Sequence, residues 1–119
     1  MMAKNPSELI DEVIGGMTSI GEEDSERMQA FLGLMKAVKK PGSLDKKTKE
    51  LISLAISLYA RCEHCIADHT REAFKAGASR QDVVETAFIT SFMGGGPVMA
   101  FFSTVLWDSI NAFAPDSGK

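Results

Sequence analysis

Residues 43–77 read SLDKKTKELISLAISLYARCEHCIADHTREAFKAG, and this stretch predicts two consecutive helices joined by a short turn. A helix start is expected at Ser43 to Asp45, because serine and aspartate side chains cap the free N–H groups there. The apolar positions of this helix recur at helical spacing up to about Ala60: Leu51, Leu54, Ala55 and Leu58. A turn is expected over residues 61–64, and the next helix runs from Cys62 or Glu63 to Ala76, where Gly77 suits a left-handed closing residue.

Two further helices are expected before this pair. Asn5, Pro6 and Glu8 are typical of a helix start, and we expect Gly15 and Gly16 to end that first helix. The second is expected over about 22–39, with lysines near its end. Its predicted inner face consists of Met28, Phe31, Leu32, Met35 and Val38.

Two more helices are expected after the pair. Ser79 and Asp82 fit a capping box, and Pro97 fits the first turn of the last helix. The predicted inner positions of the fifth helix are Val84, Ala87, Phe88, Ser91 and Phe92. Those of the last helix are Val98, Phe101, Phe102, Val105 and Ile110. Because no segment alternates apolar and polar residues, the fold class is all-α with about six helices, which excludes a thioredoxin fold.

Length and composition limit the function further. The chain has 119 residues, 45% of them hydrophobic, which predicts one folded domain over 1–119. Its net charge is −3 and its basic residues are dispersed, so nucleic acid is not an expected partner. The apolar stretch 87–107 is broken by glycines and Pro97, so we expect no membrane span. Met1 to Glu8 lacks the pattern of a secretory signal, which favours the cytoplasm.

The chemistry of the chain concentrates at residues 62–69, which read CEHCIADH. If a helix begins near Cys62, this cysteine and Cys65 lie close enough for a reversible disulfide, and Cys65 shares a face with His69. The positive end of a helix stabilises a thiolate, so one cysteine should have a lowered pKa. His69 can accept the thiol proton.

Glu50 lies one helix earlier, too far from Cys62 to touch it if the helix were straight. If the chain reverses near Arg61, the two helices pack antiparallel and Glu50 can approach His69. Carboxylate, imidazole and thiol would then form a proton relay.

The arrangement of Glu50, Cys62, His64, Cys65 and His69 resembles the signature of the alkylhydroperoxidase D (AhpD) proteins. The flanking sequence from Ser43 to Ser79 resembles the wider carboxymuconolactone decarboxylase family, most clearly over 44–92. The decarboxylase branch of that family lacks the cysteine pair, so its lactone chemistry is not implied. The chain is also shorter than full AhpD, which has a duplicated arrangement, and it resembles the single-unit members.

The resemblance implies a helical fold that assembles as homotrimers or homohexamers, and a thiol peroxidase that needs no cofactor or metal. Cys62 and Cys65 would be the redox pair, Cys65 attacking the peroxide and Cys62 meeting the reductant. Glu50 and His69 would be the relay and His64 an auxiliary polar group. The partners implied are an alkyl hydroperoxide and a dithiol reductant of the lipoyl type.

Several alternatives stay open. The cysteines could be ordinary buried side chains, or could bind zinc together with His64 and His69. Haem attachment is excluded because Ile66, and not histidine, follows Cys65. The dithiol could instead reduce protein or small-molecule disulfides without turning over peroxide, or could serve as a redox sensor in an oligomer that catalyses nothing.

Overall fold

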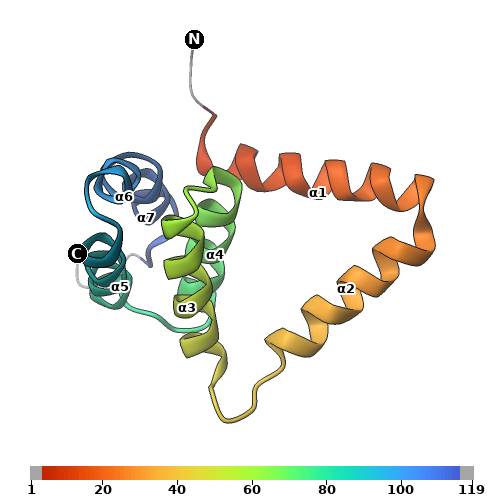
Figure 1. Ribbon diagram of the computed structural model, residues 1–119, viewed down its shortest axis with the longest axis horizontal. Coiled ribbons are helices and arrows are strands. Elements are labelled where there is room, and N and C mark those ends of the chain that lie inside the picture. Colours follow the sequence, from red (N-terminus) through yellow and green to blue (C-terminus); the bar gives the residue numbers. More distant parts are fainter. Residues whose placement is uncertain (1–3, 116–119) are drawn as a thin grey trace.

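The computed structural model describes residues 4–115, and all regular secondary structure in that range is helical (Figure 1). The elements are α1 (Pro6–Glu23), α2 (Ser25–Lys39), α3 (Lys46–Tyr59), α4 (Glu63–Lys75), α5 (Arg80–Gly94), α6 (Gly96–Phe101), the π-helical segment η1 (Phe102–Leu106) and α7 (Trp107–Phe113). Because α6, η1 and α7 follow one another without a break, they form one rod, and the predicted all-α fold with about six helices is confirmed. None of these helices is both long and apolar enough to pass through a lipid bilayer.

The reversal between α3 and α4 is a tight helix-ending motif. Arg61 adopts a left-handed conformation with φ of 57°, although it is not glycine. The N–H of Arg61 donates to the carbonyl of Leu58 at 3.0 Å, and the N–H of Cys62 donates to that of Ser57 at 3.1 Å. These two bonds satisfy carbonyls that the end of α3 would otherwise leave free, and they are the pair that defines a Schellman motif. The expected turn therefore places Cys62 directly at the start of α4.

The main core lies where α3 and α4 pack against α5 and the last rod (Figure 1). Its fully or almost fully buried side chains come from all of these elements: Leu54, Leu58, Ile66, Ala73, Phe74, Val83, Ala87, Val98, Phe102, Leu106 and Ile110. Several of the expected inner positions, among them Leu54, Leu58, Ala87 and Ile110, are confirmed by their burial. This packing fixes the relative positions of α3 and α4.

The first two helices form an arm that extends away from the core and returns to the start of α3 (Figure 1). Leu9 and Ile10 are the buried residues of α1, where they pack with Ala67 of α4. No residue of α2 is buried. The end of α2 is attached to α3 by Lys49, whose Nζ donates to the carbonyls of Val38 and Lys40.

The expected end of the first helix at Gly15 and Gly16 is wrong, because α1 continues through both glycines to Glu23. Glycine costs about 1 kcal/mol in a helix but does not remove a hydrogen bond as proline does, so it stops a helix only where a left-handed turn follows. That break comes at Asp24, which caps the start of α2 by accepting the N–H of Arg27 at 3.1 Å. The second helix therefore begins at Ser25, later than expected.

Two predicted inner faces differ from the expectation. The face of α2 is confirmed only in part: Met28 and Met35 are half-buried, whereas Phe31 and Val38 are 52% and 60% exposed. The inner face of α5 is rotated from the prediction, since Val83, Ala87 and Thr90 are buried while Phe88 and Phe92 are exposed. Small side chains let α5 approach α3 closely, and this leaves its large apolar side chains outside the core.

Candidate active site

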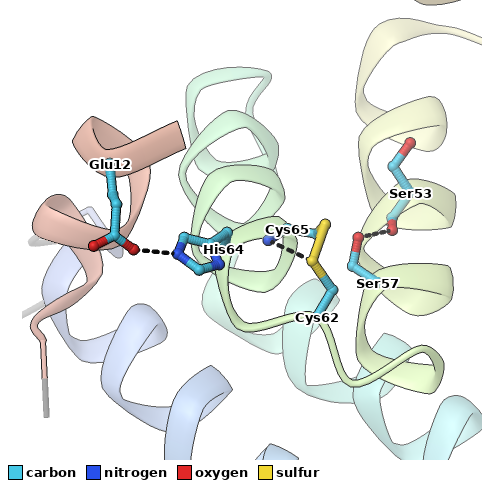
Figure 2. The surroundings of a disulfide bond; sticks show 6 residues. All are labelled: Glu12, Ser53, Ser57, Cys62, His64 and Cys65. Atoms are coloured by element: carbon cyan, nitrogen blue, oxygen red, sulfur yellow. Dashed lines mark hydrogen bonds and ion pairs between the residues drawn. A yellow bond between two sulfur atoms is a disulfide. The ribbon is translucent and has the colours of Figure 1, made fainter. Parts of the chain in front are cut away.

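The two cysteines lie at the N-terminus of α4 and are joined by a disulfide (Figure 2). Cys62 is the N-cap residue, and its Sγ accepts a hydrogen bond from the backbone N–H of Cys65 at 3.2 Å. The Cα atoms of the pair are 5.2 Å apart, inside the usual range for a disulfide. Both residues are partly exposed, so reagents can reach the pair. The helix start also provides N–H groups that stabilise negative charge on sulfur after reduction.

Glu50 and His69 meet across the antiparallel α3 and α4, within one chain. His69 Nδ1 lies 2.8 Å from Glu50 Oε1. The carboxylate of Glu50 is nearly inaccessible, with its side chain 3% exposed, whereas the imidazole side chain is 21% exposed. The expected approach of these two residues is thus confirmed. With Nδ1–H donating to the carboxylate, a neutral His69 ring has its lone pair on Nε2.

The carboxylate of Glu50 is ionised although it is buried. Burial raises the pKa of Glu50, but the hydrogen bond and the positive charge of His69, with smaller contributions from Lys39 and Lys46, bring this pKa below its ordinary value of 4.5. A buried carboxylate of this kind requires a cationic or hydrogen-bonding partner. Glu50 therefore stays an ionised hydrogen-bond acceptor for His69.

His64, between the two cysteines, is directed toward α1 (Figure 2). Its Nε2 lies 2.6 Å from Glu12 Oε1. The other carboxylate oxygen of Glu12 forms an ion pair with Lys4 Nζ. A second carboxylate–imidazole pair therefore flanks the disulfide. The cysteine motif itself does not predict this pair.

A cavity of about 540 Å³ lies between the arm and α4. One side of it is formed by apolar residues of α1 and α2, including Val13, Ile14, Met28, Leu32 and Met35. The α4 side contributes His64, Cys65 and His69, so Cys65 lines the cavity and Cys62 does not. The two sulfurs therefore have different surroundings.

The structure brings Glu50 to His69 and Cys62 to Cys65, but it pairs His64 with Glu12. Within residues 4–115, no three His, Cys, Asp or Glu side chains are grouped so that they could hold a metal ion. The zinc alternative, which required both histidines and both cysteines around one ion, has no geometric support in this part of the chain.

Glu12 and the cavity-lining role of the arm are not among the features that the sequence predicted. Glu12 is 52 residues from His64, and no local pattern connects the two. The one usable signal was indirect, because Leu9 and Ile10 form an apolar pair three and two residues before Glu12 and had to pack somewhere.

The fold and the dithiol site define a class of small helical proteins with a cysteine pair at a helix start, and comparison with known proteins gives the family. Residues 25–106 match the model of the carboxymuconolactone decarboxylase family. An uncharacterized protein of Cupriavidus necator is 36% identical over 96 residues, which cover 79% of this chain and 85% of the relative. An uncharacterized protein of the cox locus of Paracoccus denitrificans is 35% identical over 77 residues, which cover 65% and 69% of the two chains.

Solved structures agree with this assignment. A carboxymuconolactone decarboxylase family protein of Legionella pneumophila superposes with a TM-score of 0.86 at 32% identity, covering 92% of this chain and 97% of its own. A family member from Thermotoga maritima, with a suggested part in the antioxidative response, has a TM-score of 0.76 at 28% identity and covers 87% and 88%. The chain belongs to the carboxymuconolactone decarboxylase family, of which the AhpD-like proteins are members.

Proposed function

We propose that this protein is a dithiol peroxidase that reduces alkyl hydroperoxides, with Cys62 and Cys65 cycling between dithiol and disulfide. The observation that supports the proposal most is the position of Cys65. This cysteine is bonded to Cys62 and lines an apolar cavity together with His69, whose Nδ1 is hydrogen-bonded to the buried Glu50. Such a cavity suits a substrate with an apolar chain.

The proposed reaction starts with a proton transfer. With its Nδ1–H held by Glu50, the neutral His69 ring takes the Cys65 thiol proton at Nε2, and the carboxylate stabilises the imidazolium that forms. The thiolate attacks the terminal peroxide oxygen and the O–O bond breaks. The alcohol leaves with the proton from His69, and Cys65 becomes a sulfenic acid.

The second half of the cycle uses the neighbouring cysteine. The Cys62 thiol attacks the sulfur of Cys65, the S–O bond breaks, and water leaves with the thiol proton. The disulfide formed is then reduced by an external dithiol, for which we propose a lipoyl-type group attacking Cys62, the cysteine outside the cavity. His64 is kept in the proposal as an auxiliary polar group beside the pair.

We also propose an oligomeric state and a cellular compartment for the protein. Large apolar side chains are exposed on α5, with Phe92, Met93 and Ile89 at 85%, 70% and 66%. Exposed apolar surface of this kind is typical of subunit interfaces, which supports a homotrimer or homohexamer of single-domain subunits. The cycle needs a supply of reducing dithiols, so we propose the cytoplasm as its compartment.

A direct test follows the oxidant. Reduced wild-type protein, Cys65→Ser and Cys62→Ser are each mixed with one equivalent of cumene hydroperoxide, and the remaining peroxide and free thiols are measured over time. We expect wild type to consume peroxide and lose both thiols, Cys62→Ser to stop at a sulfenic acid that dimedone traps, and Cys65→Ser to be inert.

The same experiment distinguishes the alternatives. If wild type consumes peroxide no faster than Cys65→Ser, the peroxidase is refuted. Reduction of a disulfide substrate by wild type under those conditions would then identify a general disulfide reductase. If neither substrate turns over but oxidation changes the sedimentation of the oligomer, the redox sensor is the better description.

A further inference from the structure

The pair formed by His64 and Glu12 takes part in no proton transfer of the reaction proposed above, although it adjoins the redox site. His64 is the residue immediately before Cys65 in the first turn of α4. In Figure 2 its ring lies between Glu12 of α1 and the cysteine pair, with Nε2 facing the carboxylate. Both side chains are partly exposed, at 38% for His64 and 42% for Glu12.

The hydrogen bond determines which nitrogen of the ring is free. A carboxylate can only accept, so a neutral His64 must carry its proton on Nε2 and keep its lone pair on Nδ1. His69 has the opposite arrangement, because Glu50 holds its Nδ1. The cysteine pair is therefore flanked by two imidazoles that carboxylates hold in different tautomers.

The position of Glu12 on the arm is also informative. Leu9 and Ile10 fix the first half of α1 to α4, and the rest of α1 borders the cavity or is exposed. Glu12 is thus the polar contact at the point where the arm leaves the core. Lys4 forms an ion pair with Glu12, and Glu63 directly precedes His64 in α4. The titratable groups that line the same cavity as His64 are Asp68, His69 and Glu72 of α4 and Lys39 of α2.

We infer that Glu12 is a positioning residue for the reactive cysteine pair: it orients His64 and fixes its tautomer, and it thereby connects the α1 arm to the reactivity of the thiols. The inference rests on the proposed function only in taking the pair to be a reactive dithiol. Glu12 touches neither sulfur in this arrangement and acts through the imidazole. Without the carboxylate, the ring is free to rotate, and no acceptor holds its proton on Nε2.

The test measures thiolate reactivity without peroxide. Reduced proteins are alkylated with iodoacetamide, and the pseudo-first-order rate is measured between about pH 5 and 9, a range that contains the ordinary pKa values of histidine and cysteine. We expect Glu12→Ala to slow alkylation at pH 7 by about twofold to fivefold and to displace the pH profile upward, since exposed ion pairs have modest effects. Glu12→Gln retains an acceptor oxygen and should restore most of the rate.

Controls separate positioning from a general effect on the arm. Asp11→Ala removes an exposed acid that makes no hydrogen bond or ion pair within the described residues, and it should leave the rate unchanged. In a His64→Ala background, Glu12→Ala should have no further effect, because its route to the sulfurs is gone. Thermal unfolding verifies that each variant is folded.

Three results would overturn the inference: an unchanged rate in Glu12→Ala, an equal loss in Asp11→Ala, or an equal loss from Glu12→Ala when His64 is already absent. Because alkylation involves no peroxide, a protein that fails to reduce hydroperoxides but shows the expected alkylation pattern would refute the proposed function and leave this inference standing.

Discussion

The most informative single substitution is Glu50→Gln, because it removes the charge of a buried group and changes its shape very little. The Glu50 side chain is 3% exposed and accepts the Nδ1–H of His69 at 2.8 Å. Glutamine fills the same space and has an oxygen that can accept the same bond. The variant therefore tests whether the carboxylate charge, and not only the hydrogen bond, supports the imidazole.

The size of the effect follows from the kind of bond that is lost. A hydrogen bond to a charged group contributes about 1.5–3 kcal/mol, and one between neutral groups about 0.5–1.5 kcal/mol. The protonated imidazole of His69 should thus be about 1–1.5 kcal/mol less favourable in Glu50→Gln. Since 1.36 kcal/mol corresponds to about a factor of ten, we expect thiol alkylation and peroxide reduction near pH 7 to be about fivefold to tenfold slower.

The assay is the rate of disulfide formation by reduced protein with excess cumene hydroperoxide, followed by intrinsic fluorescence over a range of pH. Glu85→Gln removes an exposed carboxylate on α5 and should behave as wild type. A Glu50→Gln variant that is folded and reacts at the wild-type rate over the whole pH range would refute the relay. A loss that does not depend on pH would show that the substitution had only displaced His69.

Four further outcomes are expected. Gly77→Ala should lose about 1–2 kcal/mol of unfolding free energy in urea, because φ at residue 77 is 99°. Arg61→Gly, at φ of 57°, should gain about 1 kcal/mol, and a change of the same sign in the two variants would contradict this account. Gly94→Ala should lose about 1–3 kcal/mol, because a new Cβ would clash with Val98 Cγ2 and press on the Tyr59 ring, whereas Gly33→Ala in the open should be neutral or stabilising in the same titration. The pKa of Glu50 is lowered in the folded protein, so its ionised form contributes stability that is complete above pH 4.5 and is lost as the pH falls through the folded-state pKa. Glu50→Gln has no such titration, and its urea midpoint should therefore fall less below about pH 4 than that of wild type. Phe92→Ser should reduce the mass measured by light scattering without lowering the melting temperature, and an unchanged mass would place the subunit contact elsewhere.

Features with a local chemical cause could be predicted from the sequence. The capping boxes of Asn5 with Glu8 and of Ser79 with Asp82 are both present, as is the left-handed Gly77. Each depends on residues within one turn of the chain, and a side-chain oxygen or a missing Cβ suffices to specify it. The starts of α1 and α5 and the end of α4 are specified in this way.

Features set by contacts between distant segments could not be predicted. The rotation of α5 depends on how closely Ala87 and Thr90 approach α3, while the exposed Phe88 and Phe92 follow an equally good apolar spacing. The pairing of His64 with Glu12 depends on where α1 rests on α4. In both cases the chain pattern permits more than one partner, and packing selects among them.

The geometry of the turn explains why one short segment sets the whole site. At 1.5 Å of rise per residue, Glu50 lies roughly 14 Å from the end of α3 at Tyr59, and His69 lies roughly 9 Å from the start of α4 at Glu63. The side chains of Glu50 and His69 can span the difference between these two heights only if both face the partner helix. Facing depends on register, because each residue of a helix is rotated by about 100° from the one before it. One alanine inserted after Leu51 would therefore rotate Glu50 out of the α3–α4 contact while leaving the cysteine pair and its turn unchanged. The relay depends on this register, whereas formation of the disulfide depends only on the start of α4.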